Sequence, residues 1–236
     1  MSESIHKFIE KIKKIESKPI IIKNFINKKE IENFHKLYVE LPVEINNERQ
    51  QIIKKKWSNN FFPELQQLYK EKLKSVISDY VMDNPKTKDD LESLGLFQES
   101  FKPVSLHVDT GFDFNKIIYK QILMPLTNEG ETVIFKNRFY GCSTTFSIDP
   151  KELSAKGYNR RSSEHLDIYD KKPFDKDMQK KFLNHENIDN LKGLKVEMIY
   201  KWKLGDLLIF DRTSLHCSSS NLNKKKIGLT TSTIKK

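Results

Sequence analysis

Apolar residues recur at intervals of three and four along the first third of the chain, a spacing typical of amphipathic helices. Residues 3–16 form the first such segment, and we expect this helix to pack on the outside of a sheet; its apolar positions are Ile5, Phe8, Ile9, Ile12 and Ile15. A second helix is predicted to begin after Asn27, which can form a capping box with Glu30, and to end near Glu40.

One further helix and some short extended segments complete this region. Pro63 suits the first turn of a helix whose apolar stripe continues to Tyr80. Residues 20–23 are rich in β-branched side chains and predict a short strand, while residues 50–54 are a candidate edge strand. Residues 84–90 predict a surface loop, because Asn, Pro and Asp favour turns.

From Leu94 onward the apolar pattern alternates with a period of two, which predicts β-strands. Helices first and strands afterwards favour an α+β fold, in which an antiparallel sheet pair or barrel carries the N-terminal helices on one sheet. We expect a single domain, with helical support in residues 1–93 and the barrel core in residues 94–236. The candidate strands are residues 96–101, 104–107, 117–126, 131–135, 195–203, 206–210 and 227–233.

Residues 136–194 interrupt the strand pattern. The segment is polar, charged and weakly periodic, and a loop of this length inside a compact domain is usually a lid or a binding loop. We predict that it supplies much of the substrate pocket, unless it is simply disordered. Its candidates for recognising an anionic or amide-bearing molecule are Tyr140, Arg160, Arg161 and Tyr169.

Composition narrows the class of protein. A chain of 236 residues is long enough for one domain with a proper core, and its mixture of 37% hydrophobic and 31% charged residues is that of a globular protein. No apolar run approaches the roughly 20 residues needed to cross a bilayer, and the N-terminal segment lacks an apolar signal core, so we expect a cytoplasmic location. Cys142 and Cys217 favour reduced thiols over a disulfide framework.

The formal net charge of +10 raises the question of an anionic partner. Lysines are spread over the whole chain, and the runs at residues 54–56 and 224–226 lack the interleaved aromatic residues of a groove for single-stranded nucleic acid. Nucleic acid is therefore not favoured as a partner, and it stays open only as an alternative. The same argument disfavours a membrane surface.

The strongest chemical signal is His107-Val108-Asp109, read together with His216. Alternate residues of a strand share a face, so His107 and Asp109 can present an imidazole and a carboxylate to one metal ion. The segment from Leu204 to His216 predicts a turn, a buried strand and a short link that delivers a second imidazole. The alternative is a pair of ordinary barrel histidines with Asp109 in a turn.

The order of these features resembles the Fe(II)/2-oxoglutarate-dependent oxygenase superfamily, and within it the prolyl-hydroxylase and phytanoyl-CoA-hydroxylase-like members. Its double-stranded β-helix, a jelly-roll or cupin-like barrel, carries His-x-Asp/Glu, a distal His and then an Arg or Lys. The resemblance covers residue 94 to the C-terminus and implies that His107, Asp109 and His216 hold Fe(II). Such a site leaves three coordination positions open, enough for a bidentate 2-oxo acid and dioxygen.

The resemblance also implies a cation for the far carboxylate of 2-oxoglutarate. Lys226 lies ten residues beyond His216 at the family spacing, with Lys224 and Lys225 as competitors and Gly228 leaving space beside it. Tyr119 and Gln121 share one face of their predicted strand. The resemblance implies that this face points inward, so both are candidates to hydrogen-bond the 2-oxo acid, with Thr132 and Thr230 as further candidates. Core packing or surface exposure explains such residues equally well.

Three functional hypotheses follow. The first is an iron- and 2-oxoglutarate-dependent dioxygenase that hydroxylates a small molecule while 2-oxoglutarate is converted to succinate. The second is a nucleic-acid- or protein-modifying member of the same superfamily, for which the positive charge is the argument. The third is a cupin-like binding or sensor protein without turnover. The substrate and the oligomeric state do not follow from the sequence.

Overall fold

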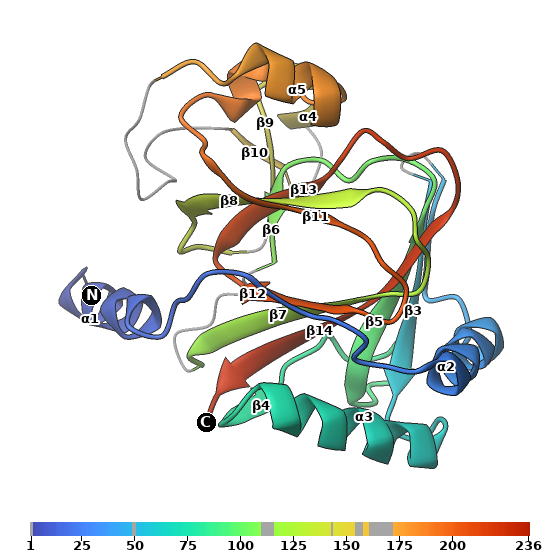
Figure 1. Cartoon of the computed structure of the whole chain (residues 1–236). Coiled ribbons are helices and arrows are strands. Elements are labelled where there is room, and N and C mark those ends of the chain that lie inside the picture. The colour runs from blue at the N-terminus through green and yellow to red at the C-terminus, as the bar shows by residue number, and fades with distance from the viewer. Residues whose placement is uncertain (1, 49–50, 110–115, 143, 154–157, 161–171) are drawn as a thin grey trace.

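A computed structural model of the chain describes residues 2–48, 51–109, 116–142, 144–153, 158–160 and 172–236. Two sheets face each other, and helices cover the outer side of the larger one (Figure 1). Apart from β9 and β10, which are parallel, the paired strands of the described chain run antiparallel. The mixed fold with antiparallel sheets that the sequence predicts is therefore confirmed.

The larger sheet has eight strands, and β4 (Tyr80–Met82) pairs with its fourth strand. In spatial order the other strands are β1 (Ile20–Ile22), β12 (Leu207–Asp211), β7 (Ile118–Pro125), β14 (Lys226–Lys235), β5 (Ser93–Ser100), β3 (Ile52–Ser58) and β2 (Ile45–Asn47). The predicted edge strand at residues 50–54 is thus an inner strand, because β2 pairs with its outer side.

The smaller sheet has six strands, in the order β10 (Tyr158–Arg160), β9 (Thr144–Ser147), β6 (His107–Val108), β13 (Ser214–Ser218), β8 (Glu131–Arg138) and β11 (Val196–Lys201). Strand β13 occupies the stretch that the sequence predicted as a short link to His216. It pairs with β6 on one side and β8 on the other, so it lies inside the sheet.

The helices of the described chain are α1 (Ser2–Lys13), α2 (Lys28–Glu40), α3 (Pro63–Val76), α4 (Pro150–Leu153), α5 (Lys176–Phe182) and a 3-10 turn at Ile188–Leu191. Asn27 and Glu30 form the predicted capping box before α2. Helix α3 ends earlier than predicted, because Tyr80 belongs to β4, which pairs with β14. Among the described residues, no helix is both long and apolar enough to span a membrane.

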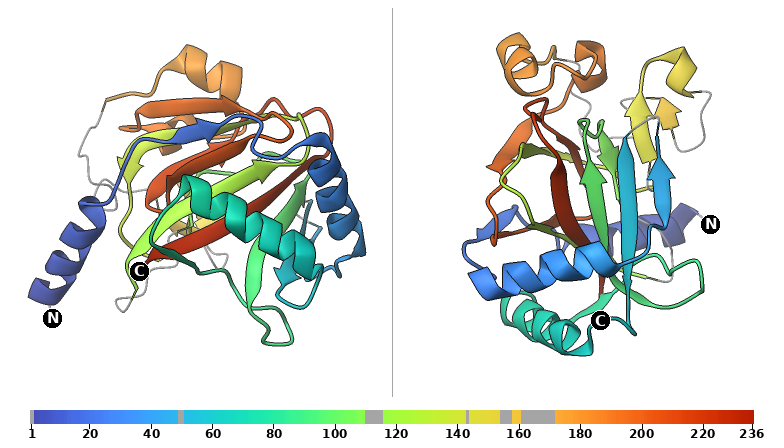
Figure 2. Two further views of the ribbon diagram at one scale, coloured as in Figure 1. Left: turned by 60° about the horizontal axis from the view of Figure 1, so that its bottom comes forward. Right: turned by 90° about the vertical axis from the view of Figure 1, so that its right-hand side faces the viewer.

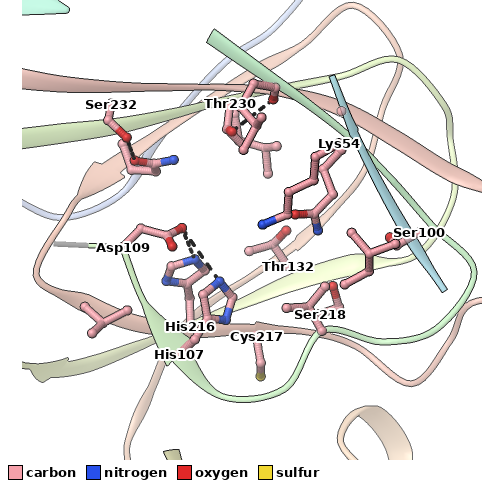
Figure 3. A pocket seen from close by; sticks show the side chains of 18 of the residues that line it. Lys54, Ser100, His107, Asp109, Thr132, His216, Cys217, Ser218, Thr230 and Ser232 are labelled. Atoms are coloured by element: carbon pink, nitrogen blue, oxygen red, sulfur yellow. Dashed lines mark hydrogen bonds and ion pairs between the residues drawn. The ribbon is translucent and has the colours of Figure 1, made fainter. Parts of the chain in front are cut away.

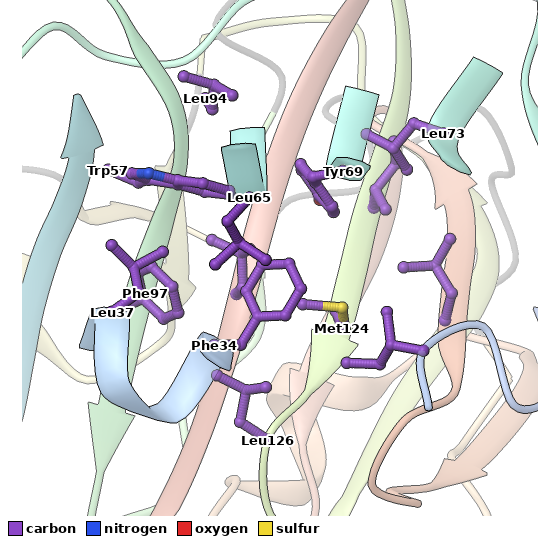
Figure 4. Close-up of a cluster of buried hydrophobic side chains, with 14 of the residues drawn as sticks. Phe34, Leu37, Trp57, Leu65, Tyr69, Leu73, Leu94, Phe97, Met124 and Leu126 are labelled. Carbon is purple, nitrogen blue, oxygen red and sulfur yellow. The ribbon is translucent and has the colours of Figure 1, made fainter. Parts of the chain in front are cut away.

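The main core lies between the larger sheet and two of the N-terminal helices. Figure 4 shows Phe34 and Leu37 of α2 and Tyr69 of α3 packed against Trp57 of β3. Burying aromatic side chains of this size contributes much of the hydrophobic stabilisation. Helix α1 does not lie across a sheet face as predicted: it projects from the side of the sheets (Figures 1 and 2), while Ile12 near its C-terminal end is buried.

A second core covers the outer side of the smaller sheet and is built largely from residues 136–194. Phe146, Phe174 and Leu183 are buried there against Val133 and Leu215. The described part of this insert therefore packs as a structured layer above the smaller sheet (Figure 1). The apolar residues of this layer are widely spaced in the sequence, which explains why the sequence pattern predicts a polar loop for the insert.

Candidate metal centre and cavity

Strands β6 and β13 bring the two predicted histidines together. His107 and His216 are register partners across this antiparallel pair, and their ring centroids are 4.1 Å apart. The Asp109 carboxylate lies 3.7 Å from Nε2 of His107 and 3.5 Å from Nε2 of His216. One possible ligand atom from each of the three residues lies within 4.8 Å of the others (Figure 3). Three ligand atoms this close together can bind one metal ion.

The same backbone contact orients both imidazoles. The Nδ1 atoms of His107 and His216 lie 2.7 Å and 3.0 Å from the carbonyl oxygens of Ser105 and Ser214. A carbonyl oxygen only accepts hydrogen bonds, so each Nδ1 carries the proton and donates. Each Nε2 consequently keeps its lone pair toward the shared point beside Asp109, which is the arrangement that a metal-binding histidine needs.

The charges of this cluster influence one another. Burial raises the pKa of Asp109, but the two histidines outweigh it and hold that pKa well below its usual range. Burial also lowers the pKa of His107, yet the adjacent carboxylate of Asp109 raises it above its usual value, against a small opposing effect of Lys54. Burial and the neighbouring His107 lower the pKa of His216. A carboxylate that stays ionised is the form that binds a metal.

Arg212 holds the backbone of Asp109 in place. Its Nε donates to the Asp109 carbonyl oxygen at 3.2 Å, and its Nη1 donates to Asp83 at 2.8 Å and to the carbonyl oxygen of Thr233 at 3.1 Å. Only 4% of the Arg212 side chain is exposed, so the guanidinium links β14 and Asp83 to the carboxylate ligand from inside the protein. The sequence pattern gave no indication of this role.

A cavity of about 850 Å³ opens beside the three residues, between the two sheets. The inward face of the larger sheet forms one wall, where side chains alternate as expected for strands. One row across this wall is Ile52, Ser100 and Lys226, and the next is Lys54, Gln98 and Gly228. All six residues line the cavity.

Lys226 is buried in this wall and only 3% exposed. Its Nζ donates to the carbonyl oxygen of Glu131 at 3.1 Å and to the Ser218 hydroxyl at 3.3 Å, and it lies 4.0 Å from the centre of the Trp202 ring. Burial lowers its pKa to about 7, although the nearby charge of Glu131 acts in the opposite direction. The competing lysines point elsewhere: Lys225 pairs with Glu99 at 3.3 Å, and Lys224 is exposed.

Trp202 connects several of the predicted residues. Its indole N–H donates to the hydroxyl of Thr132 at 2.8 Å, while its ring packs over Gly228. A Cβ atom at position 228 would lie 2.6 Å from the ring, so only glycine leaves room for Trp202 beside Lys226. The space that the sequence analysis assigned to Gly228 is therefore occupied by this indole.

Gln121, Thr132 and Thr230 line the cavity, and their hydrogen bonds to a 2-oxo acid stay a prediction. The hydroxyl of Ser232 donates to the side-chain oxygen of Gln121 at 2.8 Å, which leaves the Gln121 amide nitrogen as a donor for a ligand. Tyr119 is not among the described lining residues, and its predicted placement on the Gln121 face is wrong. A register irregularity opposite residues 119–120 breaks the alternation of β7, and Lys120 and Lys235 lie over the Tyr119 ring.

The described part of the insert contributes little to the cavity. Of its described residues, only Thr144 and Thr145 line the cavity. Tyr140 instead donates to Glu16 at 3.0 Å beside α1. Arg160 belongs to β10, and its side chain lies outside the described part of the structure, as do Arg161 and Tyr169.

Two cysteines and one further histidine have no part in the cluster. Cys142 is exposed and Cys217 is buried in the second core, and both are free thiols, as predicted. The Nδ1 of His185 lies 2.9 Å from the hydroxyl of Ser220, away from the cavity lining. Lys54, Trp202 and Arg212 are among the cavity residues that the sequence analysis missed; each reaches the site through pairing between distant segments.

Comparisons with known proteins reveal similarity in structure alone: neither a protein-family profile nor a curated protein matches this chain. HygX from Streptomyces hygroscopicus, crystallised with nickel, 2-oxoglutarate and hygromycin B, matches with a TM-score of 0.52 at 12% identity, over 100% of this chain and 87% of HygX. The epimerase SnoN, in complex with Fe3+, α-ketoglutarate and nogalamycin RO, matches with a TM-score of 0.52 at 7% identity, over 100% and 85%. This chain has the fold of HygX and SnoN. The predicted resemblance is thereby confirmed in the fold alone, which this chain shares with two proteins crystallised with a metal and 2-oxoglutarate.

Proposed function

We propose that this protein is an Fe(II)- and 2-oxoglutarate-dependent dioxygenase that hydroxylates a small molecule. The observation that carries the proposal is the convergence of His107, Asp109 and His216, whose ligand atoms share one point at the edge of a cavity. HygX and SnoN, which share the fold, were crystallised with nickel or iron, with 2-oxoglutarate, and with the small molecules hygromycin B and nogalamycin RO.

The donor set fits Fe(II). Two neutral imidazoles and one carboxylate on one side of a metal are a common ligand set of non-haem iron sites, and they leave the opposite side open. When bound there, Fe(II) supplies the chemistry that couples conversion of 2-oxoglutarate and dioxygen into succinate and CO2 to the insertion of one oxygen atom into a substrate C–H bond. The Nδ1 hydrogen bonds of both histidines hold the ligand atoms ready before the metal arrives.

Lys226 is the residue that we assign to the far carboxylate of 2-oxoglutarate. It lies on the cavity wall with its charge supported by a carbonyl oxygen, a hydroxyl and an indole ring, but by no carboxylate within salt-bridge distance among the described residues. A carboxylate placed against it would receive a charge-assisted hydrogen bond in a largely buried setting. Gln121 and Thr132, on neighbouring strands of the cavity, are proposed to orient the same molecule.

We further propose that the chain is one domain built on a double-stranded β-helix. In support, the chain crosses repeatedly between the sheets: β5, β7, β12 and β14 belong to the larger one, whereas β6, β8, β11 and β13 belong to the smaller one. The N-terminal helices α2 and α3 then stiffen the larger sheet from outside. The cavity lies between the two sheets, and the metal cluster is part of its lining.

The test is succinate formation by the iron-loaded protein with 2-oxoglutarate and dioxygen, screened with amino acids, acyl compounds and peptides. We expect at least one compound to stimulate succinate release and to gain one oxygen atom. Asp109→Ala should abolish both, whereas Asp89→Ala, in the exposed loop after β4, should change neither. Unchanged turnover in Asp109→Ala would remove the proposal.

A further inference from the structure

Lys54 places a second lysine on the cavity wall that the larger sheet forms, away from Lys226. Its side chain points from β3 into the cavity (Figure 3), and it is half-buried. The two lysines begin on strands separated by β5, one residue row apart. Because neighbouring strands lie about 5 Å apart, these lysines mark two separate positions on the same wall.

The charge of Lys54 has no carboxylate partner within the described chain. Its neighbours in the β3 lysine run are both engaged: Lys56 pairs with Glu44 at 3.5 Å, and Lys55 donates to the carbonyl oxygen of Tyr38 at 2.7 Å. The pairing row places Gln98, an amide that can also donate, next to Lys54. This wall therefore offers an anion one ammonium and one neutral donor.

The described lining of the cavity has an excess of positive charge. Both of its acidic residues are already engaged, Asp109 between the two histidines and Asp83 with Arg212 and Lys116. Five basic residues face these two acids: Lys54, Lys102, Lys116, Arg212 and Lys226. Of the five, Lys54 and Lys226 project from the wall that the larger sheet forms, and Lys226 is assigned to 2-oxoglutarate. An anionic substrate would balance the charge that is left.

We propose that the substrate of this protein carries a carboxylate, and that Lys54, with Gln98 beside it, binds that group and positions the substrate beside the metal cluster. The inference rests on the proposed function and adds the chemical class of the substrate. One ammonium and one amide match a group with a single negative charge. A lysine serves as a point charge that tolerates different carboxylate orientations, so the carbon to be hydroxylated is selected by the rest of the cavity.

The test uses matched pairs of probes, N-acetyl amino acids and their carboxamides, which differ in the carboxylate charge. They are titrated calorimetrically into protein loaded with Zn(II), which is redox-inert, and saturated with 2-oxoglutarate. We expect at least one acid to bind about tenfold or more tightly than its amide, as a lost charge-assisted hydrogen bond implies. This preference should disappear in Lys54→Met and persist in Lys56→Met, which changes the same strand outside the cavity lining.

A second variant, Lys54→Gln, removes the charge with a different side chain, so a folding defect of one variant leaves the other as the test. Equal binding of acids and amides to the unchanged protein, or a preference that survives in the folded Lys54 variants, would overturn the inference. Binding of 2-oxoglutarate to the Zn(II)-loaded protein is recorded first in the same titration. Its absence would count against the proposed function, whereas its presence without any acid preference would count against the Lys54 assignment alone.

Discussion

His107 and His216 are held by the same kind of hydrogen bond: each donates its Nδ1 proton to the carbonyl oxygen of the residue two positions before it. The two residues are also register partners of β6 and β13, so one strand pairing fixes both imidazoles. A contact within the backbone cannot be removed by mutating a side chain. The geometry of the cluster is thus tied to the sheet itself, and substitutions of the ligands should affect metal binding more than folding.

Removing the charge of Lys226 should weaken 2-oxoglutarate binding. Lys226→Met eliminates one charge-assisted hydrogen bond, worth about 1.5–3 kcal/mol, so we expect the dissociation constant to rise roughly tenfold to a hundredfold. Calorimetric titration of the metal-loaded protein measures the change. Lys225→Met is the matched control, since Lys225 pairs with Glu99 and lies outside the cavity lining. Equal effects of the two substitutions would contradict the assignment of Lys226.

The pKa of Lys226, lowered to about 7 by burial, makes 2-oxoglutarate binding depend on pH. Above pH 7 the free protein holds Lys226 mostly neutral, so binding a carboxylate there must be accompanied by proton uptake. We expect affinity to fall by up to about tenfold per pH unit above pH 7. Titrations of metal-loaded protein in buffers of different ionisation enthalpy report the protons taken up, and Lys226→Met should show none from this group.

The same shift predicts how stability changes with pH. The pKa of Lys226 is about 7 in the folded protein against an ordinary value of 10.5, so the unfolded chain binds more protons between these limits. The contribution of Lys226 to the free energy of unfolding therefore rises as pH increases from 7 toward 10.5, and it is lost as pH falls through 7. Urea unfolding of the wild type and of Lys226→Met across this range would reveal the difference. Parallel curves would contradict the lowered pKa.

Gly228 leaves room for Trp202, and filling that room should disturb the 2-oxoglutarate site. The new methyl group of Gly228→Ala would lie 2.6 Å from the indole ring, and overpacking of this kind costs about 1–3 kcal/mol. We expect a lower melting temperature and weaker 2-oxoglutarate binding, because the ring supports Lys226 and donates to Thr132. Metal affinity should not change. A change confined to metal affinity would contradict the assignment of this part of the cavity to 2-oxoglutarate.

Arg212 should act as a positioning residue for the metal cluster. Arg212→Met releases the Asp109 carbonyl oxygen and leaves Asp83 with Lys116 alone, and losses of such supporting contacts typically reduce metal affinity 10- to 100-fold. Competition with a chelator measures this affinity. Arg138→Met is the control, because Arg138 is also a buried arginine and pairs with Glu197 and Asp211 outside the cavity lining. If both substitutions lower metal affinity alike, the effect is one of general stability.

Part of the metal cluster could be predicted from local sequence, and its link to His216 came from the family resemblance, because the pairing of β6 with β13 joins distant segments. The local part is the alternation along a strand, which places His107 and Asp109 on one side. The α2 capping box is equally local, since Asn27 and Glu30 are three residues apart and bond to each other. Short-range patterns of this kind survive folding unchanged.

The remaining features depend on pairing between distant segments. Lys54 becomes a cavity residue only because β3 pairs with β5, and the register irregularity that turns Tyr119 away depends on the pairing of β7 with β14. Strand β13 begins and ends with the polar residues Ser214 and Ser218, so nothing in its composition indicates an inner strand. The end of α3 likewise depends on β14, which draws Tyr80 into a strand.

The central claim is that the three-residue cluster binds a metal which in turn binds 2-oxoglutarate. The most direct measurement is an oxygen-free calorimetric titration of 2-oxoglutarate into the protein with and without Fe(II), repeated for Asp109→Ala. The account predicts tight binding with Fe(II), and binding at least about tenfold weaker without it or without the Asp109 carboxylate, because the metal chelates the 2-oxo acid. Binding that is absent in the iron-loaded protein, or equally tight without the metal, would contradict it.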